Sequence, residues 1–174
     1  TGGDDDDQRG PIGLTLDPAA APCTVNSFVS LAEQGYFDDT PCHRLVTSPG
    51  LQVLQCGDPS GTGSGGPGYG FDTEYPETAY APNDPALAPG RGVPAGHDAM
   101  ANTGQPGSNG SQFFLVYEDS QLPPAYTIFG TIDEAGLATI EKVAAAGDDG
   151  SMGSVGGGAP PNQPVRIESV TVAS

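Results

Sequence analysis

The sequence predicts a mainly β domain in which an antiparallel sheet or barrel is accompanied by two helices. Short apolar runs of strand length recur along the 174 residues, separated by segments rich in glycine and proline. Only two stretches show the spacing of an amphipathic helix. Strands and helices do not alternate as they do around a parallel sheet, so we expect the strands to pair antiparallel.

The expected order is strand, helix, several strands, helix, strand. A first strand is expected at 11–16, where apolar residues alternate, and a first helix at 23–37, where they recur at helical spacing. A second helix is expected at 134–146, whose large apolar residues share one face, and a long loop at 57–97. The other strands are expected at 42–46, 51–56, 99–102, 111–117, 126–132 and 165–172.

The chain begins with an acidic segment, residues 1–10, that contains four consecutive aspartates. This segment has no strand or helix pattern, so we expect it to be solvated and flexible, followed by one domain at 11–174. A calcium-binding EF-hand loop starting at Asp4 is excluded, because Arg9 and Thr15 stand where it needs glycine and glutamate.

The net charge of −17 at pH 7 argues against two classes of partner. Nucleic acids and anionic membranes both require basic surfaces, so we expect no nucleic acid to bind and no membrane contact by this domain itself. No apolar run approaches the roughly 20 residues of a membrane helix. Strong charge repulsion also leads us to expect a monomer.

Three cysteines, Cys23, Cys42 and Cys56, lack the spacing of a zinc site, and we expect no metal or cofactor. The odd count allows one disulfide. It could join Cys42 to Cys56, which fall on neighbouring expected strands, or Cys23 to either of them. Buried, reduced cysteines are an equally open alternative, which a reducing compartment would favour.

The glycine-rich string "GTGSGG" (61–66) formally matches the dinucleotide-binding fingerprint. That fingerprint has to follow a strand and open a helix. Here the string follows "CGDPS" and leads into Pro67, so nucleotide binding is disfavoured.

Five strings occur in a fixed order: "CHR" (42–44), "QCGD" (55–58), "GTGSGG", "MANTG…NGSQFF" (100–114) and "IFG" (128–130). Together they resemble the signature strings of the cyclophilin family of peptidyl-prolyl isomerases, and the resemblance extends from about Pro11 to the C-terminus. It implies a closed antiparallel eight-stranded β-barrel capped by two α-helices. The family's first strand would fall within residues 1–10, which lack apolar alternation, so that strand is expected to be degenerate.

The resemblance implies a peptidyl-prolyl cis-trans isomerase that acts on proline-containing peptides or unfolded polypeptides and assists their folding. Amide resonance raises a barrier of ~18–20 kcal/mol to rotation about the peptide bond. A donor aimed at the prolyl nitrogen favours its deconjugated form, which exists mainly in the transition state. By resemblance this donor is Arg44, whose guanidinium stays protonated and presents fixed donors.

The same resemblance assigns the other site residues. Gln55 would hold Arg44 and the peptide backbone, and the main chain of Asn102 would pair with the extended peptide, which completes a catalytic set of Arg44, Gln55 and Asn102. Phe114 would form the floor of the proline pocket. The substrate-binding residues are expected to be His43, Leu51, Val53, Ala101, Gln112, Phe114, Leu122 and Tyr126.

The chain departs from the family pattern at several positions. Gln52 and Val53 stand where the family commonly has Phe and Met, so we expect a less aromatic proline pocket, with Leu51 as a substitute. Gln121 stands where many members have tryptophan, which implies weak binding of cyclosporin. Tyr126 stands where the family usually has histidine.

Two other classes of function remain. A proline-peptide binding module with the same fold and little turnover would suit the altered "LQVLQ" segment, although intact Arg44 and Gln55 favour the enzyme. A serine hydrolase using His43 or His97 is disfavoured, because no G-x-S-x-G elbow occurs. The location is open: similar actinobacterial proteins include some that lie outside the membrane on an anchor, which here would precede residue 1, and the cytoplasm is the alternative.

Overall fold

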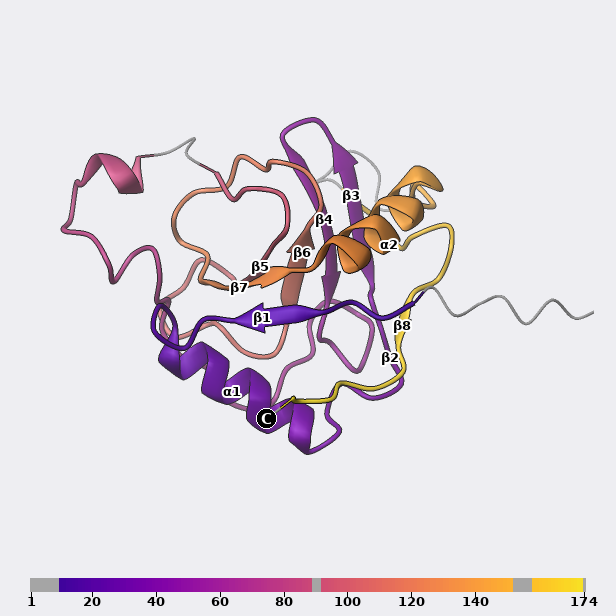
Figure 1. The fold of residues 1–174 in the computed structure, drawn as a ribbon, viewed down its shortest axis with the longest axis horizontal. Coiled ribbons are helices and arrows are strands. Elements are labelled where there is room, and N and C mark those ends of the chain that lie inside the picture. Colours follow the sequence, from indigo (N-terminus) through magenta and orange to yellow (C-terminus); the bar gives the residue numbers. More distant parts are fainter. Residues whose placement is uncertain (1–9, 89–91, 152–157, 174) are drawn as a thin grey trace, which may run out of the picture.

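The computed structural model describes residues 10–88, 92–151 and 158–173, and within them the elements follow the predicted order (Figure 1). The α-helices are α1 (Pro22–Glu33) and α2 (Glu134–Ala145), and a short 3-10 helix, η1 (Pro85–Leu87), lies in the long loop. The strands are β1 (Leu14–Leu16), β2 (Thr40–Pro41), β3 (Arg44–Ser48), β4 (Leu51–Cys56), β5 (His97–Met100), β6 (Phe113–Val116), β7 (Ile128–Ile132) and β8 (Arg166–Ile167).

The strands form a six-stranded sheet in the order β1-β7-β5-β6-β4-β3 and a two-stranded sheet of β2 and β8. Every pair of neighbouring strands is antiparallel. The prediction of a mainly β domain with an antiparallel sheet and two helices is confirmed. Closure of the strands into an eight-stranded barrel stays a prediction.

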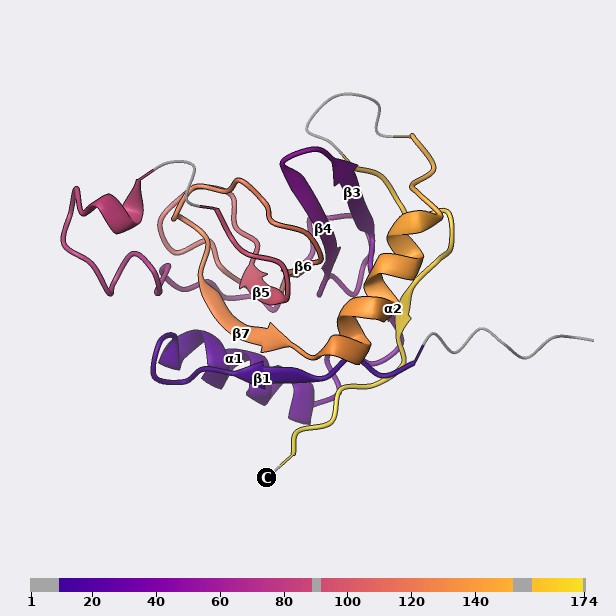
Figure 2. The ribbon, with the colours of Figure 1, turned by 45° about the horizontal axis from the view of Figure 1, so that its top comes forward.

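The larger sheet separates two apolar layers. Side chains alternate along a strand, so Leu54 and Cys56 of β4 face one side while Val53 and Gln55 face the other. The first side is the main core, which both helices join (Figures 1 and 2). Its buried residues are Ala21, Val25, Phe28, Leu31, Ala32, Phe37, Cys42, Leu45, Leu54, Cys56, Met100, Phe113, Leu115, Tyr117, Phe129, Ile132, Ile140 and Val143.

Phe28 of α1 attaches its helix to the sheet. Its ring centroid lies 5.1 Å from that of Phe37, 5.3 Å from that of Phe113 in β6 and 5.4 Å from that of Phe129 in β7. These separations fall in the range of favourable aromatic pairs, so one side chain links the helix to two strands.

Local signals explain where the helices begin and end. Pro22 stands in the first turn of α1, where its missing N–H costs nothing, and α1 ends at Glu33 rather than at the predicted residue 37. Gly35 follows with φ +68°, a left-handed conformation that terminates helices. Asp133 caps α2 by accepting a hydrogen bond from the Gly136 N–H at 2.7 Å, so this helix agrees with the prediction within one residue.

Several predicted strand limits are wrong. The strand predicted at 42–46 begins at Arg44 and continues to Ser48, because Pro49 and Gly50 form a two-residue turn in which Gly50 has φ +87°. The strand predicted at 165–172 retains only Arg166–Ile167. Its partner β2 falls between the predicted helix and the next predicted strand, where no strand was expected.

The small β2–β8 sheet carries an ion pair at its edge. The Arg166 Nη2 atom lies 2.7 Å from Asp39 Oδ1, and both side chains are largely exposed. Exposed pairs of this kind contribute at most about 1 kcal/mol, so the backbone pairing is the main link between β2 and β8.

The strand predicted at 11–16 is present as β1, which pairs with β7. Residues 1–9 lie outside the described residues. The acidic segment predicted to be flexible and the degenerate first strand expected within residues 1–10 therefore also lie outside them, apart from Gly10, which is exposed. The proposed division into 1–10 and 11–174 therefore stays a prediction.

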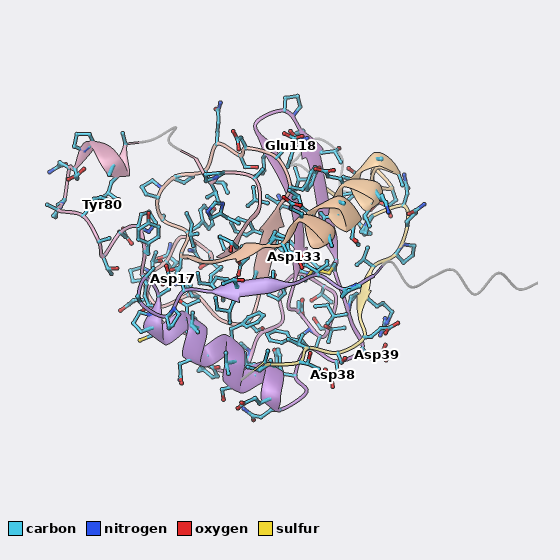
Figure 3. All side chains as sticks on the ribbon, viewed as in Figure 1. Asp17, Asp38, Asp39, Tyr80, Glu118 and Asp133 are labelled. Atoms are coloured by element: carbon cyan, nitrogen blue, oxygen red, sulfur yellow. A yellow bond between two sulfur atoms is a disulfide. The ribbon has the colours of Figure 1, made fainter. Side chains whose placement is uncertain are left out.

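The acidic residues labelled in Figure 3 are spread over different parts of the molecule. Asp17 precedes α1, Asp38 and Asp39 precede β2, Glu118 follows β6 and Asp133 precedes α2 (Figure 3). The loop that carries Tyr80 and η1 extends away from the sheet (Figures 1 and 3). Within the described residues, neither helix has the length and apolarity that a membrane crossing needs.

A disulfide joins Cys42 to Cys56, and Cys23 is a free, exposed cysteine. Cys42 lies just before β3 and Cys56 is the last residue of β4. The bridge therefore closes the open end of the β3–β4 hairpin. The pairing of Cys42 with Cys56, one of the alternatives left open by the sequence, is the one observed.

Asp98 of β5 interrupts the apolar pattern of the sheet. Its side chain is fully buried, and neither carboxylate oxygen has a hydrogen-bond partner among the described residues. Gly130 of β7 lies opposite, and a Cβ there would approach Asp98 Oδ1 to 2.7 Å. Burial raises the pKa of Asp98 to about 7.

We predict that replacing both Cys42 and Cys56 by alanine lowers the free energy of unfolding by about 3 kcal/mol, because the bridge closes a short loop in the unfolded chain. Urea unfolding without reductant measures the loss. Cys23→Ala, which removes only the exposed thiol, is the control and should unfold like the parent. A parent whose stability is unchanged by a thiol reductant would contradict the prediction.

We predict that Asp98→Asn makes the stability of the protein less dependent on pH. The unfolded pKa of an aspartate is about 3.9, so between about pH 4 and about pH 7 the folded parent retains a proton that the unfolded chain releases. The contribution of Asp98 to the stability of the parent therefore falls as the pH rises through this window.

Urea midpoints of parent and variant at about pH 4 and about pH 8 test this, since the difference between the two proteins isolates Asp98 from the other carboxylates. The variant should be the more stable protein at the higher pH and equal to the parent at the lower. A difference in urea midpoint between Asp98→Asn and the parent that is the same at both pH values would contradict the prediction.

Candidate functional site

The candidate site lies on the side of the larger sheet that faces away from the main core. Arg44 of β3 is directly opposite Gln55 of β4, Gln55 is opposite Phe114 of β6, and Phe114 is opposite Ala99 of β5. Side chains of directly opposed residues point to the same face of a sheet. Four neighbouring strands thus bring a cation, an amide and an apolar surface into one row.

An apolar cluster forms the floor of this face. Its buried residues are Val46, Val53, Val93, Ala99, Phe114 and Val116, and half-buried Leu51, Ala101, Leu122, Tyr126 and Ile128 pack against them.

The apolar cluster unites six of the residues that the sequence predicts to bind substrate. Tyr126 meets Phe114 edge to face, with ring centroids 5.6 Å apart. Leu51, the first residue of β4, packs on the cluster as expected of a substitute for the missing aromatic residue. The six residues that the structure brings together are Leu51, Val53, Ala101, Phe114, Leu122 and Tyr126.

A chain of hydrogen bonds, the polar relay, runs from Arg44 through Gln55 to Gln112. Arg44 Nη1 donates to Gln55 Oε1 at 2.9 Å, and Gln55 Nε2 donates to Gln112 Oε1 at 2.9 Å. Gln112 Nε2 in turn donates to the carbonyl oxygens of Gly63 and Gly65, both at 3.0 Å. The predicted contact between Gln55 and Arg44 is therefore present, and Gln112 belongs to the relay rather than to the apolar cluster.

The guanidinium of Arg44 is half-buried at the edge of the apolar cluster. Burial lowers the pKa of Arg44, and the nearby phenol of Tyr126 acts in the opposite direction. An arginine starts from a pKa so high that it remains a cation at any ordinary pH. The site thus offers a permanent charge with oriented N–H donors.

The loop of residues 58–65, here called the Asp58 loop, supports the polar relay. Asp58 is fully buried, and its carboxylate accepts hydrogen bonds from Ser60, Gly63 and Gly65. Sequence reasoning missed this aspartate as a functional residue. The signal was available in "QCGD" followed by a glycine-rich string, but only the fold places the loop beside Gln112.

His43, predicted to bind substrate, is not part of the apolar cluster. A Cβ on Gly63 would lie 3.6 Å from His43 Cδ2 and Nε2, so the imidazole lies against the Asp58 loop. Its Nδ1 atom is buried without a partner among the described residues. Burial lowers the pKa of His43, with a smaller opposing effect of Asp58 and a further lowering by Arg44.

Asn102 follows β5, and its side chain organises the neighbouring loops. Its Nδ2 atom donates to the Ala125 carbonyl at 2.7 Å, and its Oδ1 atom accepts from the Gly104 N–H at 2.9 Å. The role predicted for this residue concerned the main chain, and the side chain has a separate structural function.

A hollow of about 740 Å³ adjoins the polar relay. Its walls combine Gln55, Gln112, Ala101 and Asn102 with many glycines, whose missing side chains leave the space open. The residues that line it are Gln55, Gly63, Ser64, Gly65, Gly66, Pro67, Gly68, Tyr69, Gly70, Ala101, Asn102, Thr103, Gly107, Ser108, Gly110, Ser111 and Gln112.

The arrangement can bind an extended chain in the hollow, seat an apolar ring on the cluster and direct a cationic donor at a polar atom of that ring's amide. Such a site stabilises a change in charge distribution without making a bond. Within the described residues, no group of three or more His, Cys, Asp or Glu side chains is arranged to hold a metal ion.

Comparisons with known proteins agree on one family. The profile of the "Cyclophilin type peptidyl-prolyl cis-trans isomerase/CLD" family matches residues 4–172. A protein of Mycobacterium leprae named probable peptidyl-prolyl cis-trans isomerase B is 57% identical over 162 residues, which are 93% of this chain and 53% of that protein. A protein of the same name from Mycobacterium tuberculosis is 55% identical over 94% of this chain and 50% of its own length.

The chain thus spans about half the length of these two relatives. Among solved structures, a cyclophilin-type peptidyl-prolyl cis-trans isomerase of Cryptosporidium parvum, crystallised in the presence of the dipeptide Ala-Pro, matches with a TM-score of 0.72 and 29% identity. The match covers 96% of this chain and 95% of the other.

Proposed function

The chain belongs to the cyclophilin-type peptidyl-prolyl cis-trans isomerases, and on this premise we propose that it catalyses rotation about X–Pro peptide bonds in extended or unfolded polypeptides. The observation that carries the proposal is the position of Arg44: its guanidinium is held by Gln55 at the edge of an apolar cluster that can receive a proline ring.

The reaction makes and breaks no covalent bond, so its barrier is the resonance of the amide. Rotation removes the overlap between the prolyl nitrogen and the carbonyl, and the nitrogen gains a lone pair that can accept a hydrogen bond. In the proposed mechanism Arg44 donates to that lone pair. Since the lone pair exists only near the transition state, the interaction lowers the barrier without stabilising the bound substrate equally.

The apolar cluster would hold the proline ring while the rest of the amide turns. Phe114 and Val53 form its floor, and Leu51, Leu122 and Tyr126 stand around them. Burial of the ring excludes water from the Arg44 donor, which strengthens the hydrogen bond. The hollow beside Gln55, Ala101 and Asn102 would receive the residues that flank the proline, and the main chain of Asn102 is the proposed partner of their backbone.

The alternative is a proline-peptide binding module with the same fold and little turnover. A pocket with Leu51 and Val53 in place of the family's usual Phe and Met still offers an apolar surface to the ring, since the two side chains pack on the same cluster as Phe114. The oriented donor on Arg44 has no function in simple binding of the ring, and it therefore favours catalysis.

We further propose that the strands close into an eight-stranded barrel. We also propose that the protein acts as a monomer. Its proposed location is outside the reducing cytoplasm. The disulfide between Cys42 and Cys56 supports the location, because such bridges persist in oxidising compartments. The net charge of −17, which opposes self-association, supports the monomer.

We predict that Arg44→Ala lowers kcat/KM for cis-to-trans isomerisation of an Ala-Pro peptide by about 10²- to 10³-fold, the loss typical of removing one transition-state donor. Arg44→Lys should recover only part of the activity, because a lysine keeps the charge but lacks the rigid fork of donors. NMR exchange or a protease-coupled assay measures the rates.

Arg166→Ala is the matched control, since Arg166 is exposed and pairs with Asp39 at the β2–β8 sheet. It should isomerise the peptide at the parent rate. Two results would reject the enzyme: a folded parent that binds the peptide without accelerating exchange, which would establish the binding module, or an Arg44→Ala variant with full activity.

We predict weak binding of cyclosporin by the parent and an affinity about tenfold higher in Gln121→Trp, because an indole adds a large apolar surface next to Leu122 at the cluster. Isothermal titration measures both affinities. Gln34→Trp, at the end of α1, controls for a non-specific effect of the new ring. Equal affinities of parent and Gln121→Trp would contradict the prediction.

A further inference from the structure

Asp58 is a buried carboxylate that no step of the proposed reaction uses. It follows β4 by two residues and is fully shielded from solvent. Its Oδ1 atom accepts from the Ser60 N–H at 2.8 Å and the Ser60 hydroxyl at 2.7 Å. Its Oδ2 atom accepts from the N–H groups of Gly63 at 2.7 Å and Gly65 at 3.1 Å.

The carboxylate of Asp58 is ionised at neutral pH. Burial alone would raise the pKa of Asp58, but the hydrogen bonds from Ser60, Gly65 and Gly63 outweigh it and lower the pKa to about 2. A carboxylate that accepts several hydrogen bonds is strongly favoured in its charged form. Asp58 therefore acts as a fixed acceptor for the loop.

Two residues of the Asp58 loop are held from both sides. The N–H groups of Gly63 and Gly65 point to Asp58, and their carbonyl oxygens accept the two N–H bonds of the Gln112 side-chain amide. Asp58 thus determines where these two carbonyl oxygens stand, and the carbonyls determine how the amide of Gln112 is turned.

The orientation of Gln112 propagates to Arg44 because each amide has one donor end and one acceptor end. With its NH₂ group on the two carbonyls, Gln112 presents its oxygen to Gln55. Gln55 must then use its own NH₂ group on Gln112, which leaves its oxygen for Arg44. If Gln112 turned over, its oxygen would face the two carbonyl oxygens and its NH₂ group would face the NH₂ group of Gln55. If Gln55 turned over as well, its NH₂ group would face the donors of Arg44.

We propose that Asp58 is a positioning residue for the isomerase reaction: by holding the Asp58 loop it sets the direction of the polar relay and thereby the aim of the Arg44 donor. This inference rests on the proposed function, in which Arg44 donates to the prolyl nitrogen. Asp58 itself touches neither Arg44 nor Gln55 in the relay, which ends at Gln112 and the two carbonyls.

The glycines of the loop fit this role. Gly63 has φ +81°, a conformation that other residues rarely adopt, and a Cβ on Gly65 would collide with Asp58 Oδ1. The close approach of backbone to carboxylate therefore requires glycine at 65. The string "GTGSGG" fails as a nucleotide fingerprint. Its glycines allow the backbone conformation in which one carboxylate holds the N–H groups of Gly63 and Gly65.

Asp58→Asn tests the inference with almost no change of shape. One oxygen of the side chain becomes an NH₂ group, which would face the N–H donors of Gly63 and Gly65 or of Ser60. We expect kcat for an Ala-Pro peptide to fall about tenfold while KM changes little, because the cation stays and only its aim is lost. The loss should be smaller than that of Arg44→Ala.

A double-mutant cycle with Gln112→Ala separates positioning from a general effect on folding. If Asp58 acts through Gln112, adding Asp58→Asn to Gln112→Ala should cost less than about twofold in kcat. If Asp58 only supports the fold, the loss of kcat in the double variant is the product of the losses in Asp58→Asn and Gln112→Ala. That result would overturn the inference. Asp17→Asn is the matched control, since Asp17 accepts two backbone N–H bonds in a turn remote from the relay.

A spectroscopic readout decides the inference even if the parent proves inactive. The side-chain NH₂ resonances of Gln55 and Gln112 should shift in Asp58→Asn and stay unchanged in Asp17→Asn. Should Asp58→Asn fail to fold, Ser60→Ala removes only one of the four bonds and should shift the same resonances with a loss of about two- to threefold in kcat. Two results would overturn the inference. One is a folded variant in which the Gln55 and Gln112 resonances do not shift; the other is an Asp58→Asn or Ser60→Ala variant of an active parent whose kcat equals that of the parent.

Discussion

The register of the β3–β4 hairpin is the constraint on which the site depends. A strand exchanges its two faces every residue, so a slip by one position would move Arg44 and Gln55 into the main core and expose Leu45 and Leu54. Burial of two polar groups and exposure of two large apolar ones oppose that slip strongly. The turn at Pro49 and Gly50 fixes the same register from the closed end of the hairpin.

From this register the division of labour between the two faces follows. The core face carries the stability, with helices and aromatic rings closing over it, and the opposite face can carry polar chemistry at little cost. The chain has 22 acidic and only 5 basic residues, and one of these few cations, Arg44, is half-buried. Partial burial of a charge costs free energy because the charge loses contact with water. Gln55 gives Arg44 a neutral amide partner, and this hydrogen bond orients the cation.

The features that could be predicted from the sequence are those set by local pattern or by short, specific strings. The second helix was predictable because its cap, Asp133, and its apolar face lie within one stretch. The residues of the apolar cluster were predictable only through the resemblance to a family, since nothing local links Leu51 to Tyr126. Strand β2 was not predictable, because Thr40–Pro41 shows no alternation and pairs with a segment at the other end of the chain.

Two side chains show why the other features of the site could be learned only from the structure. His43 is next to Arg44 in sequence, yet it precedes the strand and turns to the Asp58 loop instead of the apolar cluster. Asp58 acts on backbone atoms, and the position of backbone atoms is what a string of glycines leaves undetermined. Sequence strings identify the residues that meet the substrate more readily than those that hold them in place.

The bridge between Cys42 and Cys56 closes the hairpin into a covalent ring of residues 42–56. Arg44 and Gln55 are two of the residues that make up this ring. Thr47, Ser48 and Pro49 are exposed at the tip, where chains are most readily nicked by proteases. A cut there would leave both strands attached at their opposite end, so the two halves of the molecule could not diffuse apart. In a protease-rich environment, the segment that carries the cation could thus be cleaved once without being lost.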